Sequence, residues 1–153
     1  MISGDLLSYV NYFKQWADIN PEVKFFMYGS VEKGIEYARG FEDFEYPFVW
    51  LEQPTISIDD NGMSSFNMQY FSGISVLIQA PLDDREAQII ASDAALKIMM
   101  DLLKKVNHDR KEDIIMCEID GSKMEAVSQL WADSHYGWRL EFKPMLNVNK
   151  YLC

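Results

Sequence analysis

A long amphipathic segment between residues 83 and 106 constrains the fold more than any other part of the sequence. Its apolar side chains recur at three- and four-residue steps: Ala87, Ile90, Ala91, Ala94, Ile98, Met99, Leu102 and Val106. This spacing puts them on one face of a helix, which has to be buried against another layer of structure. Asp83 and Glu86 stand three residues apart and predict the start of the helix as an aspartate form of the capping box.

A second amphipathic helix is predicted near the N-terminal end, over residues 5–19. Its apolar face consists of Leu6, Tyr9, Val10, Phe13, Trp16 and Ala17. Asn20-Pro21 ends it, because the residue before a proline is pushed out of the helical region. Residues 31–38 predict a short third helix, capped by Ser30 and ended by Gly40.

The remaining apolar segments predict strands. We expect them at residues 23–28, 46–51, 55–59, 63–70, 73–80, 114–119, 124–132 and 138–144. The segment 46–51 is continuously apolar, which is typical of a strand covered on both faces. Residues 133–137 join the last two strands as a hairpin.

The turn Asp60-Asn61-Gly62 predicts the register of the first hairpin. A three-residue loop with glycine in the left-handed region makes a type I turn with a bulge. That loop pairs Ile56 with Phe66, whereas a two-residue Asn-Gly loop would pair Ile56 with Asn67. We expect the longer loop, because it keeps apolar side chains opposite each other.

The order of these elements predicts a single α+β domain over residues 1–153. We expect an antiparallel sheet with long hairpins, and the N-terminal helix and the long central helix packed on one face of it. A chain of 153 residues can bury a core without disulfides or metal. The sequence has no internal repeat and no linker rich in serine, proline or glycine that would mark a domain boundary.

The charge balance excludes several classes of partner. The chain has 14 Lys and Arg against 24 Asp and Glu, which gives a net charge of −10. Phosphate binding draws on Lys and Arg, and no basic stripe is present, so we expect neither sequence-specific nucleic-acid binding nor binding to an anionic membrane. No apolar run approaches the ~20 residues that cross a bilayer, and the start does not resemble a secretory signal. Cys117 and Cys153 indicate neither a disulfide framework nor a zinc site.

No residue pattern predicts a catalytic, cofactor or metal site. His108 and His135 lie in polar turn contexts, where we expect them exposed, and Cys117 is expected in the apolar core. The run 59–62 lacks the alternating oxygen ligands of a calcium loop. Asp83-Asp84 could supply paired carboxylates for acid–base chemistry or Mg²⁺, but helix capping accounts for Asp83. We therefore expect a protein that is not an enzyme and that uses no cofactor.

Large aromatic side chains occur in predicted loops and on open strand faces. Two explanations stay open: the rings cover the second face of the sheet within one subunit, or some of them face another subunit, since aromatic residues are enriched at interface centres. The candidate interface residues are Phe41, Phe44, Tyr46, Tyr70, Phe71, Trp131 and Trp138.

The order and texture of the elements also suggest a family. The N-terminal helix and the strand Tyr46-Pro47-Phe48-Val49-Trp50-Leu51-Glu52 precede the hairpin around residues 60–62. The strand 74–80 then leads through Asp83-Asp84 into the long helix, and the last hairpin carries Gly137-Trp138-Arg139-Leu140-Glu141-Phe142. This layout resembles the small α+β proteins at the head–tail junction of tailed phages: tail-terminator, tail-completion and neck-ring proteins.

The resemblance implies a structural virion protein that is made in the bacterial cytoplasm and joins the head–tail junction. It implies a ring of identical subunits, a hexamer or dodecamer, in contact with tail-tube and connector or portal proteins, with DNA passing through the lumen. Such rings close through unlike, head-to-tail contacts, and carboxylates lining the lumen would repel the phosphates. The acidic charge fits equally well an adaptor or immunity-type module that covers a basic partner, so that alternative stays open.

Overall fold

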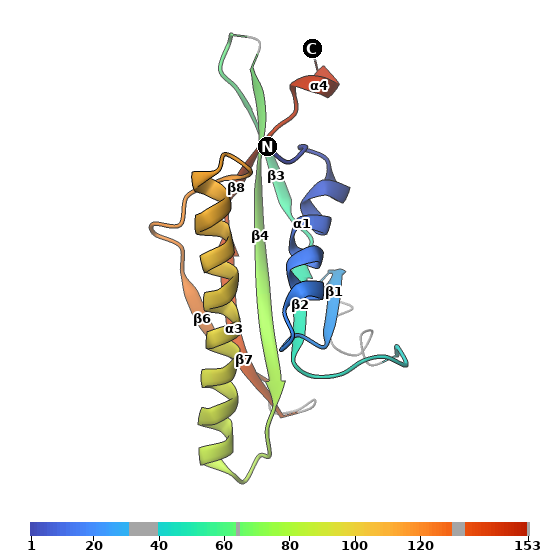
Figure 1. Cartoon of the computed structure of the whole chain (residues 1–153), viewed down its shortest axis with the longest axis vertical. Helices are drawn as coiled ribbons and strands as arrows, with labels where there is room; N and C mark the ends of the chain where they lie inside the picture. Colours follow the sequence, from blue (N-terminus) through green and yellow to red (C-terminus); the bar gives the residue numbers. More distant parts are fainter. Residues whose placement is uncertain (31–39, 64, 130–133, 153) are drawn as a thin grey trace.

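The computed structural model describes residues 1–30, 40–63, 65–129 and 134–152, which form the α+β domain that the sequence predicts (Figure 1). The predicted helix over residues 31–38 lies outside the described residues. In chain order the elements are α1 (Leu6–Ile19), β1 (Phe25–Gly29), β2 (Phe48–Glu52), β3 (Thr55–Asp60), β4 (Phe66–Gln79), α3 (Arg85–Lys111), β5 (Met116–Cys117), β6 (Met124–Gln129), β7 (His135–Phe142), β8 (Pro144–Asn147) and α4 (Asn149–Leu152).

The sheet is organised around β4. The second half of β4 pairs with β2 on one edge and β7 on the other, and its first half pairs with β3 and β8. β1 extends the sheet beyond β2, and β6 extends it beyond β7. These ladders are antiparallel except for β1–β2, which is parallel. The chain between β1 and β2 is long enough for the crossover that a parallel pair requires.

β4 is one strand of 14 residues, whereas the sequence predicted two strands with a break after Tyr70. Residues at the expected break are held by partners from other strands: Phe71 pairs with Thr55, and Ser72 pairs with Phe142. The Ser72 hydroxyl also donates to the Glu52 carbonyl at 2.8 Å. These long-range contacts keep the strand continuous where the local pattern is weak.

The first hairpin has a different register from the predicted one. Ile56 lies opposite Tyr70, four positions beyond the expected Phe66, and Ile58 lies opposite Met68. The connection is longer because the side chains of Asp60 and Asn61 accept hydrogen bonds from the backbone of the residues that follow them. An even shift in register leaves every side chain on its expected face, so the apolar pairing survives.

α3 begins one residue later than predicted and ends later. Its N-cap is Asp84, whose carboxylate accepts from the Ala87 backbone at 3.0 Å, so the prediction of Asp83 was wrong. The apolar face is buried along the middle and end of the helix, but Ile90 is 62% exposed. The start of α3 extends past the end of β4 (Figure 1).

The C-terminal part differs from its prediction in several boundaries. The expected strand 114–119 is reduced to β5, and residues 135–137, expected in a loop, belong to β7. β8 and α4 were not predicted. β8 begins at Pro144, a position where a strand tolerates proline.

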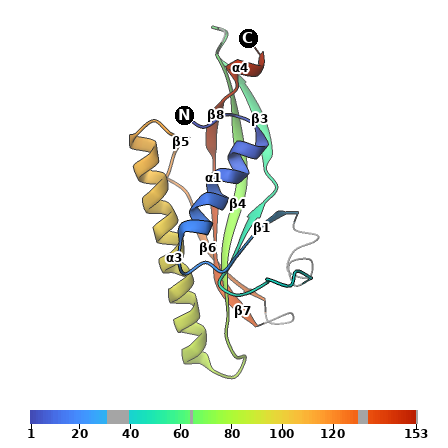
Figure 2. The same cartoon turned by 45° about the vertical axis from the view of Figure 1, so that its right-hand side comes forward.

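The core lies between the two long helices and one face of the sheet (Figures 1 and 2). Its largest fully buried side chains include Tyr9, Phe13, Leu51, Tyr70, Ile74, Met99, Leu102, Leu140, Phe142 and Leu146. A smaller cluster covers the opposite face of the sheet, around Phe48, Trp50 and Leu77. Both helices therefore pack on one face, as predicted, and loop residues cover part of the other.

Candidate functional site

The aromatic side chains predicted at an interface mostly serve the subunit itself. Phe44 packs edge-on against Phe25, Phe48 and Tyr46, with ring centroids 5.2–5.4 Å apart. These rings cover the second face of the sheet. Phe41, which also contacts Phe25, is the most exposed of them at 43%.

Tyr70 is not available to a neighbouring subunit, so that part of the prediction is corrected. Its side chain is 1% exposed, stacks on Tyr9 at 4.6 Å and donates its hydroxyl proton to the Gly4 carbonyl at 2.8 Å. Trp138 is half-buried and donates from its indole N–H to the Ser92 carbonyl of α3 at 2.9 Å. Phe71 is half-buried beside Lys143. Trp131 lies outside the described residues.

Of the three predictions made for histidine and cysteine side chains, two are confirmed and one is wrong. His108 is exposed, at 71% of its side chain, and Cys117 is buried in the core, both as expected. Burial raises the pKa of the Cys117 thiol, which keeps it protonated and unreactive. His135 is fully buried in β7, with its ring 6.4 Å from that of Tyr46, so its predicted exposure was wrong. The aromatic residues on the second sheet face cover it, a long-range contact that the local sequence does not show.

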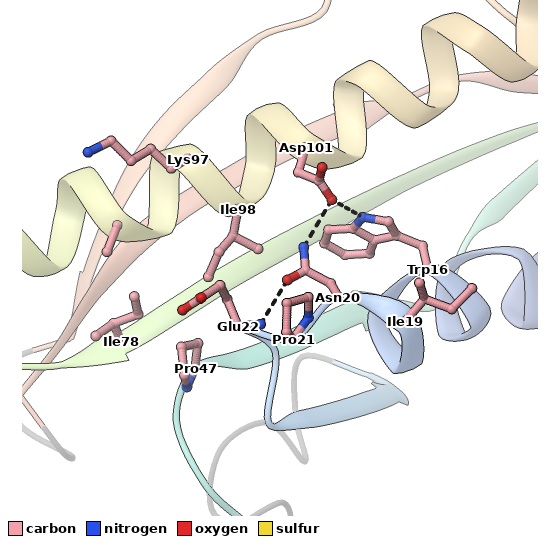
Figure 3. Close-up of a pocket in the computed structure, with 11 residues that line it drawn as sticks. Trp16, Ile19, Asn20, Pro21, Glu22, Pro47, Ile78, Lys97, Ile98 and Asp101 are labelled. Atoms are coloured by element: carbon pink, nitrogen blue, oxygen red, sulfur yellow. Dashed lines mark hydrogen bonds between the residues drawn. The ribbon is translucent and has the colours of Figure 1, made fainter.

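A groove of about 640 Å³ lies between the end of α1 and the middle of α3 (Figure 3). Asp101 fixes one wall by accepting hydrogen bonds at 3.0 Å from both the Trp16 indole and the Asn20 amide. The Asn20 side chain in turn accepts from the Glu22 backbone. The other lining residues are mainly apolar: Ile19, Pro21, Pro47, Ile78, Ala94 and Ile98.

Two charged side chains of this groove have partners within the subunit. Asp101 holds Trp16 and Asn20, and Lys97 is paired with Asp93 at 2.6 Å, while Glu22 supplies a second carboxylate to the lining. Among the described residues that line it there is no serine, cysteine or histidine that a neighbouring base could activate. The described residues include no group of three or more His, Cys, Asp or Glu side chains that could hold a metal ion.

A buried polar cluster joins α1 to the end of α3. Asp109, 6% exposed, accepts hydrogen bonds from the Tyr12 hydroxyl at 2.8 Å and from Lys105, and His108 lies 3.3 Å away. Burial on its own would raise the pKa of the Asp109 carboxyl, but the hydrogen bonds from Lys105, Tyr12 and His108 and the charge of Lys105 together hold it below 3.8. These interactions stabilise the packing of α1 against the end of α3.

Replacing Asp109 by asparagine is expected to lower the free energy of unfolding by about 1–3 kcal/mol at neutral pH, because the buried Tyr12 and the half-buried Lys105 lose a charged acceptor. The native pKa of Asp109 lies below its unfolded value, so its contribution is present above about pH 4 and is lost as the pH falls through the native pKa. Denaturant unfolding at a series of pH values should show the two proteins converging in acid. A difference independent of pH would contradict this.

The matched control for that experiment is Asp93→Asn. Asp93 pairs with Lys97 on the same helix, but 55% of its side chain is exposed. An exposed pair of this kind contributes only a few tenths of a kcal/mol, about 0.3–0.5. The control should therefore unfold almost like the parent.

Several of the exposed apolar side chains lie on the elements that project from the body. β3 is exposed at every residue, with Ile58 at 66%, and Met63 in the following turn is 83% exposed. At the opposite end of the molecule, Ile89 and Ile90 on the first turns of α3 are 70% and 62% exposed. Figure 1 shows the β3–β4 hairpin and the start of α3 as the two extremities. Neither the length of the chain nor the apolar spacing of its helices predicted that these side chains would be exposed.

Comparison with known proteins gives no assignment. No family model matches the sequence, and no curated protein matches it. None of the helices that the structure describes is long and apolar enough to span a bilayer.

Proposed function

We propose that this chain is a structural subunit of a tailed phage or prophage, which joins copies of itself into a ring at the head–tail junction. The observation that carries the proposal is the exposed apolar surface on the projecting β3–β4 hairpin and on α3. Large contiguous apolar patches on a monomeric protein usually mark an interaction site, and Ile58 and Met63 on the hairpin and Ile89 on α3 are each more than half exposed. The order of elements, similar to that of tail-terminator and neck-ring proteins, supplies the setting.

The ring has a hexameric or dodecameric arrangement in this proposal, and it contacts tail-tube and connector or portal proteins. Its acidic charge of −10 suits a bore through which DNA passes without being held. A structure of the assembled ring whose bore is neutral or basic would remove this part of the proposal.

Light scattering coupled to size-exclusion chromatography tests the ring directly. The purified chain is expected to run at a multiple of its 17.8 kDa mass, with the multiple constant over a range of concentration. Since some rings assemble only on a tail, the chain should also be measured after co-expression with its neighbouring genes. Portal, tail-tube and tape-measure genes beside it would support the proposal.

The rival function is an acidic adaptor or immunity-type module. A surface hollow lined by Glu118, Asp120, Glu125 and Glu141, and also by Lys123 and Lys143, favours it, because its four carboxylates outnumber its two lysines and suit a basic partner. A chain that stays monomeric under all these conditions, and whose mass rises only when a basic protein is added, would favour this rival and count against the ring.

A further inference from the structure

One flank of the molecule carries an apolar strip made by α1 and β3. Ile56 and Ile58 lie opposite Tyr70 and Met68, and directly paired residues share a sheet face. Tyr70 stacks beneath Tyr9 of α1, so the two isoleucines extend the core face outward beyond the helix. They stay 42% and 66% exposed.

The start of α1 contributes to the same flank. Tyr12 and Trp16 of α1 face α3, because they donate to Asp109 and Asp101. At about 100° per residue, Leu6 is turned away from this side by about 100° and Leu7 by about 160°, and they are 44% and 69% exposed. Figures 1 and 2 both place the start of α1 beside β3. We name this surface the α1–β3 strip, and it consists of Leu6, Leu7, Ile56 and Ile58.

A second apolar strip runs along α3 on the opposite flank. Asp101, Lys105 and Asp109 mark the side of α3 that faces α1. The apolar side chains turned away from that side form the α3 strip: Ile89, Leu96, Met100 and Leu103. Ile89 and Met100 are 70% and 49% exposed, and the two leucines are half-buried.

The two strips have unlike shapes and opposite charges at the same end of the molecule. β3 ends in Asp59-Asp60, whereas the last turn of α3 carries the exposed cations Arg110 and Lys111. Asp109 of the same turn is buried and paired with Lys105, and Glu112 and Asp113 follow the helix. In Figure 1 the end of β3 and the end of α3 both point upward, with α1 to the right of β4 and α3 to its left. Copies placed side by side in one orientation therefore bring a basic helix end toward an acidic strand end.

We propose that the α1–β3 strip of one copy packs against the α3 strip of the next copy. A contact between unlike strips leaves one strip of each kind free at the ends of a growing chain, so copies add until rotation closes a ring. Burial of the two apolar strips stabilises the contact between copies. Attraction between Asp60 of one copy and Arg110 of the next sets their relative orientation. This inference rests on the proposed function, because it names the surfaces through which the ring would close.

Cross-linking between engineered cysteines tests the pairing of the two strips in the full chain. Ile58→Cys and Met100→Cys are made singly and together in a Cys153→Ser background, with buried Cys117 left in place. A flexible bismaleimide is added to each protein, and the products are separated under denaturing conditions. The double variant should give a ladder of covalent multimers, each single variant should stay monomeric, and a mixture of the two single variants should stop at a dimer.

The other outcomes each overturn something specific. Dimers from either single variant would show that a strip packs against its own kind, which contradicts the unlike contact. A double variant without a ladder, in a protein that light scattering shows to be a ring, would overturn the strips but keep the proposed function. A protein that stays monomeric by light scattering would overturn the ring itself.

The matched control is the pair Ile58→Cys with Ile19→Cys. Ile19 is 81% exposed at the end of α1 and belongs to neither strip. This pair should give no ladder. A ladder as strong as that of Ile58→Cys with Met100→Cys would mean that chance collisions suffice, and the assignment of the strips would be withdrawn.

Discussion

Gly137→Ala is expected to lower the free energy of unfolding by about 3 kcal/mol, a loss at the upper end for an overpacked site. Gly137 lies in β7 opposite Leu77 of β4. A Cβ added there would meet the Val76 carbonyl oxygen at 1.8 Å, the Val76 carbonyl carbon at 2.8 Å and the Leu77 Cα at 3.1 Å. These atoms are backbone of the central strand, so relief requires β4 and β7 to move apart.

Denaturant unfolding of Gly137→Ala and Gly29→Ala, compared with the parent, provides the measurement. Gly29 also lies in a strand, but the nearest atom to its added Cβ is a Met27 methyl carbon at 4.0 Å. Alanine at such a position is neutral or stabilising by about 0.4–1 kcal/mol, because it restricts the unfolded chain. Equal effects of the two substitutions would show that the close approach of β4 to β7 is wrong.

The elements that the sequence predicts best are those whose pattern is local. α1 and α3 follow from apolar spacing within a single segment, and Asp5 caps α1 by accepting from the Ser8 backbone. The boundary of β4 does not follow, because Phe71 and Ser72 are held by Thr55, Glu52 and Phe142, which are distant in the chain. Register, strand continuity and the parallel β1–β2 pair all depend on such partners.

In the candidate interface, too, local sequence pattern predicted less than long-range contacts determine. The density of aromatic residues left open whether the rings cover the sheet or face another subunit, and Tyr70 and Trp138 pack within the subunit because helices cover them. The exposed strips are aliphatic, and two signals for them were present in the sequence: adjacent leucines at residues 6 and 7, and the alternation of Ile56 and Ile58 next to a turn. The exposure of these side chains could not be predicted, since it depends on how much of the sheet α1 covers.

Reversing one charge on each side of the proposed contact is expected to separate assembly from folding. Asp60→Lys places a cation toward the basic end of α3 in the next copy, and Arg110→Glu places an anion toward the acidic end of β3. Each single reversal should weaken assembly on the order of 100-fold, since like charges at an interface cost several kcal/mol, about 1.4 kcal/mol per tenfold. The mass from light scattering should fall toward that of the monomer, with little change in the melting temperature of Arg110→Glu, whereas Asp60→Lys also loses the hydrogen bond from the Gly62 backbone.

The double variant Asp60→Lys with Arg110→Glu is the decisive comparison. It keeps the parent's net charge of −10 and reverses both sides of every contact in the ring, so assembly should return. Asp60→Asn serves as the control for the turn, because an amide oxygen can still accept from the Gly62 backbone as the carboxylate does at 2.8 Å. Asn should weaken assembly less than Lys, since it removes an attraction without adding a repulsion. If the double variant stays as dissociated as the single ones, Asp60 and Arg110 do not face each other, and the ring closes through other surfaces.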